Sequence, residues 1–113
     1  MLSLGMDIGT STVKLVLLKN QEIEKQWMAV HHGNPFVCLE KGLSTLELAM
    51  DIPFSLCVTG SNTEALLEQD SAIPSLGDIP AIVEGVRWII PQVGSVIEIG
   101  SQGARFITDL QSR

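Results

Sequence analysis

Apolar and polar positions alternate along the first thirty residues with the two-residue period of β-strands, and short polar turns separate the alternating runs. The pattern predicts strands over residues 4–9, 12–19 and 22–30. In the second of these, apolar residues occupy both faces except at Lys14, which is typical of a central strand covered by helices. The third is polar through Gln26, so we expect it at the edge of the sheet.

A helical period follows these strands. Asn34 suits the N-cap of a helix and Pro35 its first turn, and apolar residues then recur at spacings of three and four. We expect this helix to end near Asp51, before Pro53. Gly42 lies inside it at a cost of up to about 1 kcal/mol relative to alanine, which packing must offset.

Helices and strands alternate after this first helix. The next strand is predicted over residues 54–59, and Ser61 followed by Glu64 matches the capping box of a short helix. A short fifth strand is predicted around residues 72–73, where Pro74 restricts it to a sheet edge.

A second long helix and a hairpin complete the pattern. Asp78 is the expected cap of this helix, and Pro91 stops it. Strands over residues 96–100 and 104–110 form the hairpin. Three strands in succession followed by alternating helices and strands predict an α/β fold. We expect a mixed sheet of about five strands covered by helices, plus a C-terminal β-hairpin.

Composition narrows the classes of partner. The chain has 113 residues, a formal net charge of −6 and seven Lys and Arg, which argues against nucleic acid. It has neither an apolar run of about 20 residues nor the pattern of a signal peptide, so we expect no membrane contact. Two cysteines, Cys38 and Cys57, make no disulfide framework and predict a cytoplasmic location.

An internal repeat is the most informative feature of the sequence. Residues 6–14 line up with residues 97–105, 91 positions later. Each copy has an acid, Ile, Gly and a hydroxyl residue, then a tight turn, then a cation at Lys14 or Arg105. Both copies lie where one predicted strand turns into the next.

This repeat has the composition of a phosphate site. A tight turn of small residues can direct successive N–H groups into one concavity, and hydroxyls add donors. The acids at Asp7 and Glu98 repel phosphate unless they hold Mg²⁺, which bridges carboxylates and phosphate oxygens. Two such hairpins facing each other would hold a polyphosphate from both sides. The alternative for either copy alone is a strand that meets a turn, without a ligand.

Both copies resemble motifs of a known superfamily. Residues 7–14 are similar to the first phosphate motif of the sugar kinase, heat-shock-protein 70 and actin superfamily, and residues 98–103 to its second. The closer resemblance is to the ATPases that activate 2-hydroxyacyl-CoA dehydratases and include the ATPase subunits of benzoyl-CoA reductase. An Ala-Thr-Gly segment and a Trp-Pro-like helix end of that family have counterparts at residues 58–60 and 88–91. The resemblance therefore covers essentially the whole chain, in order.

The resemblance implies an actin-like ATPase with two ribonuclease H-like lobes and with ATP and Mg²⁺ between them. Residues 1–91 would form the first lobe, and residues 92–113 would open the second. Members of the family dimerise, share one [4Fe–4S] cluster, and use ATP hydrolysis to drive an electron into a partner dehydratase or reductase.

The resemblance also implies roles for single residues. Asp7 would organise Mg²⁺ through water, and Glu98 and Gln102 are the candidates for a part in hydrolysis. Two loops would hold the phosphates through their backbone and side chains. Their residues are Gly9, Thr10, Ser11, Thr12, Lys14, Gly100, Ser101 and Gln102.

Three departures from the family pattern affect hydrolysis more than phosphate binding. Glu98 replaces Asp, Ser101 replaces Gly, and Gly103 replaces Asp. The cluster cysteines of the family lie beyond the second motif, and neither cysteine of this chain matches one of them. We therefore expect an N-terminal portion of an activator, with negligible turnover by itself.

Two other functions remain open: a non-catalytic interaction or regulatory domain of the same fold, and a kinase for a small metabolite. A metal site at His31, His32 and Cys38 has too few ligands for a common zinc pattern, and a solvated loop explains these residues better. Trp88 near a helix end is expected in a core or an interface.

Overall fold

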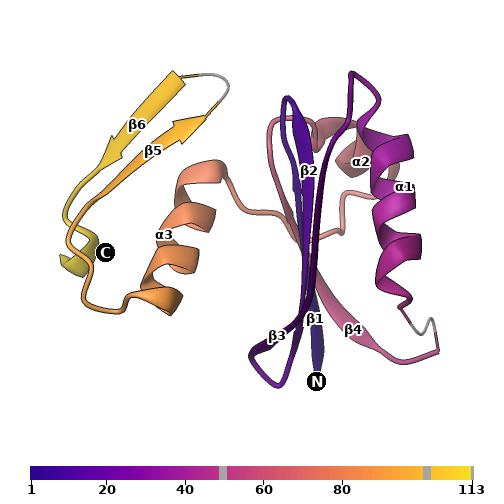
Figure 1. The fold of residues 1–113 in the computed structure, drawn as a ribbon, viewed down its shortest axis with the longest axis horizontal. Coiled ribbons are helices and arrows are strands. Elements are labelled where there is room, and N and C mark those ends of the chain that lie inside the picture. The colour runs from indigo at the N-terminus through magenta and orange to yellow at the C-terminus, as the bar shows by residue number, and fades with distance from the viewer. Residues whose placement is uncertain (49–50, 101–102, 113) are drawn as a thin grey trace. The chain divides into compact units, whose positions relative to one another are not determined.

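The computed structural model describes residues 1–48, 51–100 and 103–112. They form two compact units, Met1–Leu76 and Gly77–Arg113. The first unit has a sheet in the order β3-β2-β1-β4 (Figure 1). Its strands are β1 (Leu2–Ile8), β2 (Thr12–Lys19), β3 (Glu22–Val30) and β4 (Phe54–Thr59). β2 runs antiparallel to both β1 and β3, whereas β4 runs parallel to β1. The prediction of a mixed sheet with β3 at its edge is confirmed.

One face of this sheet forms the core together with α1 (Pro35–Leu46). Met6, for example, pairs with Leu15 of β2 and with Val58 of β4. The buried core residues are Leu4, Met6, Ile8, Val13, Leu15, Leu17, Cys38, Leu39, Leu46 and Val58. On the opposite face, Val16 and Leu18 are only half-buried. The sequence predicts burial of β2 on both faces. The strand is fully buried only on the face that contributes to the core.

Gly42 allows α1 to approach the sheet closely. A Cβ atom at this position would lie 2.5 Å from two ring carbons of Trp27 and 2.8 Å from Cδ1 of Leu15. Glycine is thus the residue that fits between the helix and the strands. Close packing accounts for a residue that intrinsic helix propensity disfavours.

The helix begins where the sequence predicts and ends earlier. Asn34 is its N-cap, without a side-chain cap hydrogen bond, and Pro35 is its first residue. The predicted end near Asp51 is wrong, because Glu47 already adopts a left-handed conformation with φ 54°. Its N–H donates to the Ser44 carbonyl oxygen over 3.2 Å. Residues 49–50 lie outside the described residues.

The segment between β4 and the second unit differs from its prediction in two places. The short helix is α2 (Glu64–Gln69), and its N-cap is Thr63 instead of Ser61. The fifth strand predicted at residues 72–73 is wrong, because a turn at Asp70 takes up the N–H groups of both residues. Strand-like pairing is confined to one parallel bridge, between Val58 and Ser75.

The second unit contains α3 (Asp78–Ile89), a hairpin and a short 3₁₀ turn at Leu110–Ser112. The hairpin strands are β5 (Val96–Gly100) and β6 (Gly103–Ile107). Asp78 is the first helical residue, one after the N-cap Gly77. β6 ends at Ile107, short of the predicted residue 110, and the chain then turns at Asp109 with φ 57°.

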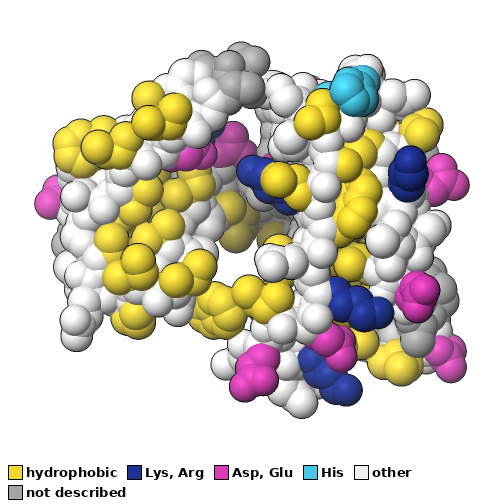
Figure 2. Space-filling view, in the orientation of Figure 1, with side chains coloured by type: hydrophobic (Ala, Val, Ile, Leu, Met, Phe, Trp, Pro, Cys, Tyr) yellow, Lys and Arg dark blue, Asp and Glu magenta, His cyan; other side chains and the backbone are white. Residues whose placement is uncertain are grey.

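A small apolar core holds this unit together. It consists of Val83 from α3, Ile107 from β6 and Leu110 from the 3₁₀ turn. The other face of the hairpin is exposed and apolar, as Figure 2 shows, with Ile97 and Ile99 exposed by 69% and 81%. The packing places α3 with the hairpin, so the compact units divide after Leu76. The assignment of residues 1–91 and 92–113 to two lobes of a longer protein stays a prediction.

None of the helices in the described part of the chain is long and apolar enough to cross a membrane.

Candidate functional site

Three loops meet at one edge of the four-stranded sheet. β3 and β1 both run antiparallel to β2, and β4 runs parallel to β1. The carboxyl ends of β1, β3 and β4 therefore lie at the same edge (Figure 1). The loops that follow these strands begin at Gly9, His31 and Gly60. Hydrogen bonds join the second and third loops to the first.

The loop after β1 contains the first predicted phosphate motif. The Gly9 N–H donates to the Thr12 carbonyl oxygen over 2.9 Å and closes a tight turn. Thr10 at its tip is exposed, and Ser11 and Thr12 are half-buried. A Cβ atom at Gly9 would lie 3.3 Å from the Thr12 carbonyl oxygen, so the turn leaves little room for a side chain there. The predicted strand–turn–strand is confirmed.

Asp7 and Lys14 face each other across this hairpin. They are cross-strand partners, and Asp7 Oδ2 lies 4.0 Å from Lys14 Nζ. Their side chains are 41% and 53% exposed, so the pair is worth no more than about 1 kcal/mol. Both charged groups are therefore accessible to a ligand at this edge.

The residues around Asp7 suit one mode of Mg²⁺ binding, in which a single carboxylate shares the ion with water and phosphate oxygens. Within residues 1–48, 51–100 and 103–112, no group of three or more His, Cys, Asp or Glu side chains could hold a metal ion. Mg²⁺ does not need such a cage, because it retains several waters and takes one or two carboxylates together with phosphate oxygens. Asp7 can supply one such carboxylate, so the site suits Mg²⁺ that arrives with a phosphate.

The second motif forms the β5–β6 hairpin and repeats the pairing of the first. Glu98 and Arg105 are cross-strand partners, with Glu98 Oε1 3.6 Å from Arg105 Nε. They occupy the positions of Asp7 and Lys14 in the repeat. Arg105 also bonds Asp78 Oδ2 over 3.1 Å. Both copies thus place an acid opposite a cation on adjacent strands, next to the turn.

The turn of the second motif is partly described. Gly100 and Gly103 form the last pair of the hairpin, and Ser101 and Gln102 lie outside the described residues. Gly103 has φ 127°, a conformation that side chains rarely adopt. Glycine therefore suits the backbone conformation at this position.

His31 is a site residue that sequence reasoning missed. The predicted loop between strand and helix is confirmed and His32 in it is exposed, but His31 itself is buried, with only 6% of its surface exposed. Its Nδ1 accepts from the Gly33 N–H over 3.1 Å, and its Nε2 lies 2.9 Å from the Gly9 carbonyl oxygen. A carbonyl only accepts, so Nε2 carries the proton and donates. The sequence held no signal for this role, since a His-His-Gly run also reads as a polar loop.

Asn62 is the second missed residue. Its Nδ2 donates to the Gly9 carbonyl oxygen over 2.8 Å, and its backbone N–H donates to the Ile8 carbonyl oxygen over 2.9 Å. Gly60, at φ 107°, makes this approach possible, because a Cβ atom there would lie 2.3 Å from the Ile8 oxygen. The Thr59-Gly60 pair at the end of β4 was the available signal in the sequence.

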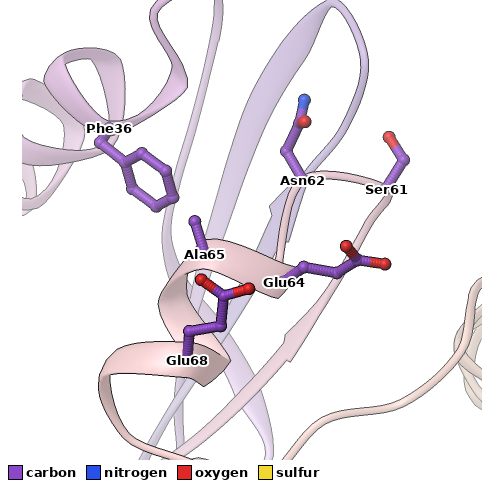
Figure 3. Close-up of a pocket in the computed structure, with 6 residues that line it drawn as sticks. All are labelled: Phe36, Ser61, Asn62, Glu64, Ala65 and Glu68. Atoms are coloured by element: carbon purple, nitrogen blue, oxygen red, sulfur yellow. The ribbon is translucent and has the colours of Figure 1, made fainter.

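A pocket of about 280 Å³ lies beside Asn62 (Figure 3). The Phe36 ring from α1 points toward Ala65 of α2. The pocket is lined by Phe36, Ser61, Asn62, Glu64, Ala65 and Glu68. The carboxylates of Glu64 and Glu68 repel an anion here, so this pocket does not suit a phosphate.

The two cysteines do not form a cluster site. Cys38 is buried in α1 on the core face of the sheet. Cys57 is a half-buried residue of β4 that pairs with Gly5 and so lies on the opposite face. Both thiols are free. A [4Fe–4S] cluster needs several cysteines around one centre, and these two residues do not fit it.

Comparison with known proteins connects this fold to one group. The 2-hydroxyisocaproyl-CoA dehydratase activator of Clostridioides difficile is 31% identical over 111 residues, which are 95% of this chain and 41% of the relative. A solved structure of the activator of the 2-hydroxyisocaproyl-CoA dehydratase from Clostridium difficile, with bound ADPNP, has a TM-score of 0.78 at 30% identity. It covers all of this chain and 43% of the activator, so the chain spans about two fifths of the length of these relatives.

Other structures match at the level of the fold. Component A of (R)-2-hydroxyglutaryl-CoA dehydratase from Acidaminococcus fermentans has a TM-score of 0.78 at 23% identity, over 96% of this chain and 42% of that protein. A Ppx/GppA family member from Aquifex aeolicus has a TM-score of 0.56 at 14% identity, over 97% of this chain and 48% of that protein. No family model matches the chain. The chain therefore has an actin-like ATPase fold and is a homologue of an activator of 2-hydroxyacyl-CoA dehydratases, as its two motifs predict.

Proposed function

We propose that this chain binds the phosphates of ATP together with Mg²⁺ and serves as the N-terminal part of an activator of a 2-hydroxyacyl-CoA dehydratase or a related reductase. The observation that carries the proposal is the pair of hairpins in which an acid and a cation face each other across adjacent strands. The similarity to an activator solved with bound ADPNP supports it, because ADPNP is a nucleotide.

Each site residue has a proposed part in binding. Mg²⁺, when bound with the nucleotide, bridges phosphate oxygens and neutralises their charge. Asp7 holds the metal through water, and Lys14 adds a positive charge beside the phosphates. The phosphates are held by the loop residues Gly9, Thr10, Ser11 and Thr12, and from the second motif by Gly100, Ser101 and Gln102.

The finer activity belongs to the longer protein. There we propose that Glu98 and Gln102 take part in hydrolysis, and that hydrolysis drives an electron through a [4Fe–4S] cluster into the partner dehydratase or reductase. Cys38 and Cys57 do not fit the cluster, so its ligands would come from other parts of that protein. A homodimer and a cytoplasmic location complete the proposal.

Nucleotide binding is tested by calorimetric titration of the chain with ATP, with and without Mg²⁺. We expect Mg²⁺ to tighten binding and Asp7→Asn to remove that effect, because the variant loses the carboxylate charge. Asp51→Asn changes an exposed carboxylate in a turn before β4 and is the matched control. ATP binding that is indifferent to Mg²⁺ in the unsubstituted chain would contradict the role of Asp7.

Turnover is a separate test. We expect the 113-residue chain to hydrolyse no ATP above the buffer rate, because in the proposed arrangement residues 92–113 form only the opening hairpin of the second lobe. Robust Mg²⁺-dependent hydrolysis that disappears in Asp7→Ala would show that this chain is itself an ATPase.

A second candidate is a non-catalytic domain that binds nucleotide and regulates or recruits a partner. It is favoured by Gly103, which has no carboxylate where the family pattern has one. A longer protein that binds ATP without hydrolysing it would support this candidate over the first. A small-metabolite kinase would instead form a phosphorylated product in a metabolite screen.

A further inference from the structure

The carbonyl group of Gly9 lies at the start of the phosphate loop, the segment of residues 9–12 between β1 and β2. Two side chains from different loops donate to this one oxygen: Nε2 of His31 over 2.9 Å and Nδ2 of Asn62 over 2.8 Å. A carbonyl oxygen has two lone pairs, and here both have a partner. The orientation of the peptide between Gly9 and Thr10 is therefore set from outside the loop.

The backbone of both donors is itself anchored to the same segment. The His31 N–H donates to the Ser11 carbonyl oxygen, and the Asn62 N–H donates to the Ile8 carbonyl oxygen, each over 2.9 Å. Each residue thus contacts the loop twice, once through its backbone and once through its side chain. Such double contacts hold both donors at a defined distance from the Gly9 oxygen.

The opposite end of the same peptide is the Thr10 N–H. The structure has no cis peptide bonds among the described residues, and in a trans peptide the N–H points opposite to the C=O. Because the Gly9 oxygen points toward His31 and Asn62, the Thr10 N–H points away from them. A glycine peptide that rotated the other way would turn its oxygen toward an incoming phosphate, and the two would repel.

We infer that His31 and Asn62 are positioning residues, which keep the Gly9 oxygen turned away from the phosphate and the Thr10 N–H turned toward it. The inference rests on the proposed phosphate-binding function. Neither side chain touches the ligand in this arrangement, and each acts through the Gly9–Thr10 peptide.

The test uses the chain of 113 residues, labelled with ¹⁵N and ¹³C, and magnesium tripolyphosphate as the probe. His31→Asn retains an acceptor near the Nδ1 position for the Gly33 N–H but is too short to reach Gly9. His31→Gln extends far enough to donate at the Nε2 position. His32→Asn changes the exposed neighbouring histidine and is the matched control.

We expect His31→Asn to bind the probe about threefold to tenfold more weakly, in line with the loss of one hydrogen bond. His31→Gln and His32→Asn should bind like the unsubstituted chain. The Gly9 carbonyl and Thr10 amide resonances should move in His31→Asn, while core resonances such as those of Leu15 stay in place. A purely structural role would predict neither the rescue by glutamine nor a shift confined to one peptide.

Asn62→Ala is the second, independent variant, with Ser61→Ala as its neighbour control. It keeps the test decisive if His31→Asn fails to fold. Tripolyphosphate binding of unchanged strength in a folded Asn62→Ala or His31→Asn would overturn the inference. If the Thr10 amide resonance of the unsubstituted chain does not shift with tripolyphosphate, the proposed function fails. If the unsubstituted chain and its variants bind tripolyphosphate equally well, only the inference about His31 and Asn62 fails.

Discussion

Gly60 connects the end of β4 to the end of β1 by direct backbone contact. Its φ of 107° is rarely adopted by residues with a side chain, and a Cβ atom would lie within 2.7 Å of the Ile8 nitrogen, carbon and oxygen atoms. Backbone atoms of a central strand cannot move aside cheaply. The position therefore excludes every residue except glycine.

We predict that Gly60→Ala destabilises the chain by at least about 2 kcal/mol, because backbone strain adds to the contact with Ile8. Urea unfolding followed by circular dichroism measures the loss. Gly5→Ala is the matched control, since a Cβ atom there meets nothing within 4 Å. Equal stability of the two variants would contradict this account of Gly60.

At this scale, the sequence predicted the strand–turn–strand around Gly9 but missed the two side chains that bond its carbonyl oxygen. The repeat marks Asp7 and Lys14, because an acid and a cation recur at matching positions. His31 and Asn62 act through a single carbonyl that lies 22 and 53 residues away along the chain. No local pattern carries information about such contacts, which only the sheet topology creates.

At the scale of elements, the two glycines inside helices have opposite surroundings. A Cβ atom added at Gly42 of α1 would lie 2.5 Å from Trp27 and 2.8 Å from Leu15, whereas one added at Gly85 of α3 would meet nothing within 4 Å. Alanine improves helix propensity at both positions by up to about 1 kcal/mol. Packing decides which of the two positions can accept it.

We predict that Gly85→Ala stabilises its unit by up to about 1 kcal/mol, and that Gly42→Ala destabilises the chain by about 1–2 kcal/mol despite the same gain in propensity. Thermal and urea unfolding of the two variants measure the difference. Stabilisation by Gly42→Ala would mean that α1 can move away from Trp27 without losing its packing.

Strands, hairpins and the start of α1 could be predicted because each has a local period or a terminating residue, whereas the N-caps of α2 and α3 differ from the predicted ones by one or two residues. The end of α1 could not, because a left-handed Glu47 interrupts a helical pattern that continues in the sequence. The fifth strand failed for a similar reason. The turn at Asp70 takes the N–H groups that a strand would need, and only Ser75 forms a bridge with Val58.

At the scale of the whole molecule, the two units have cores of unequal size. Among the residues that the structure describes, the first unit has ten buried residues in one cluster, and the second has three. The second unit, Gly77–Arg113, is smaller than the domains that a hydrophobic core alone usually keeps folded. Its hairpin also leaves Ile97, Ile99 and Phe106 exposed.

We predict that amide hydrogens of β5 and β6 exchange with solvent about 100-fold faster, or more, than those of β1 and β2, because local opening costs less where few apolar contacts break. Hydrogen–deuterium exchange followed by NMR measures both sets in one sample. Similar protection in all four strands would show that the two units open together.

The hydrogen bonds to Gly9 also have a consequence for the order in which the first unit folds. β1, β2 and β3 are consecutive and can pair early, since the loops between them are short. Asn62 arrives only when β4 has docked parallel to β1, after the chain has passed through α1. The loop after β1 therefore gains this hydrogen bond only once β4 is in place. A ligand that requires this form of the loop binds the folded unit, so by mass action it raises the free energy of unfolding and protects every strand of the sheet at once.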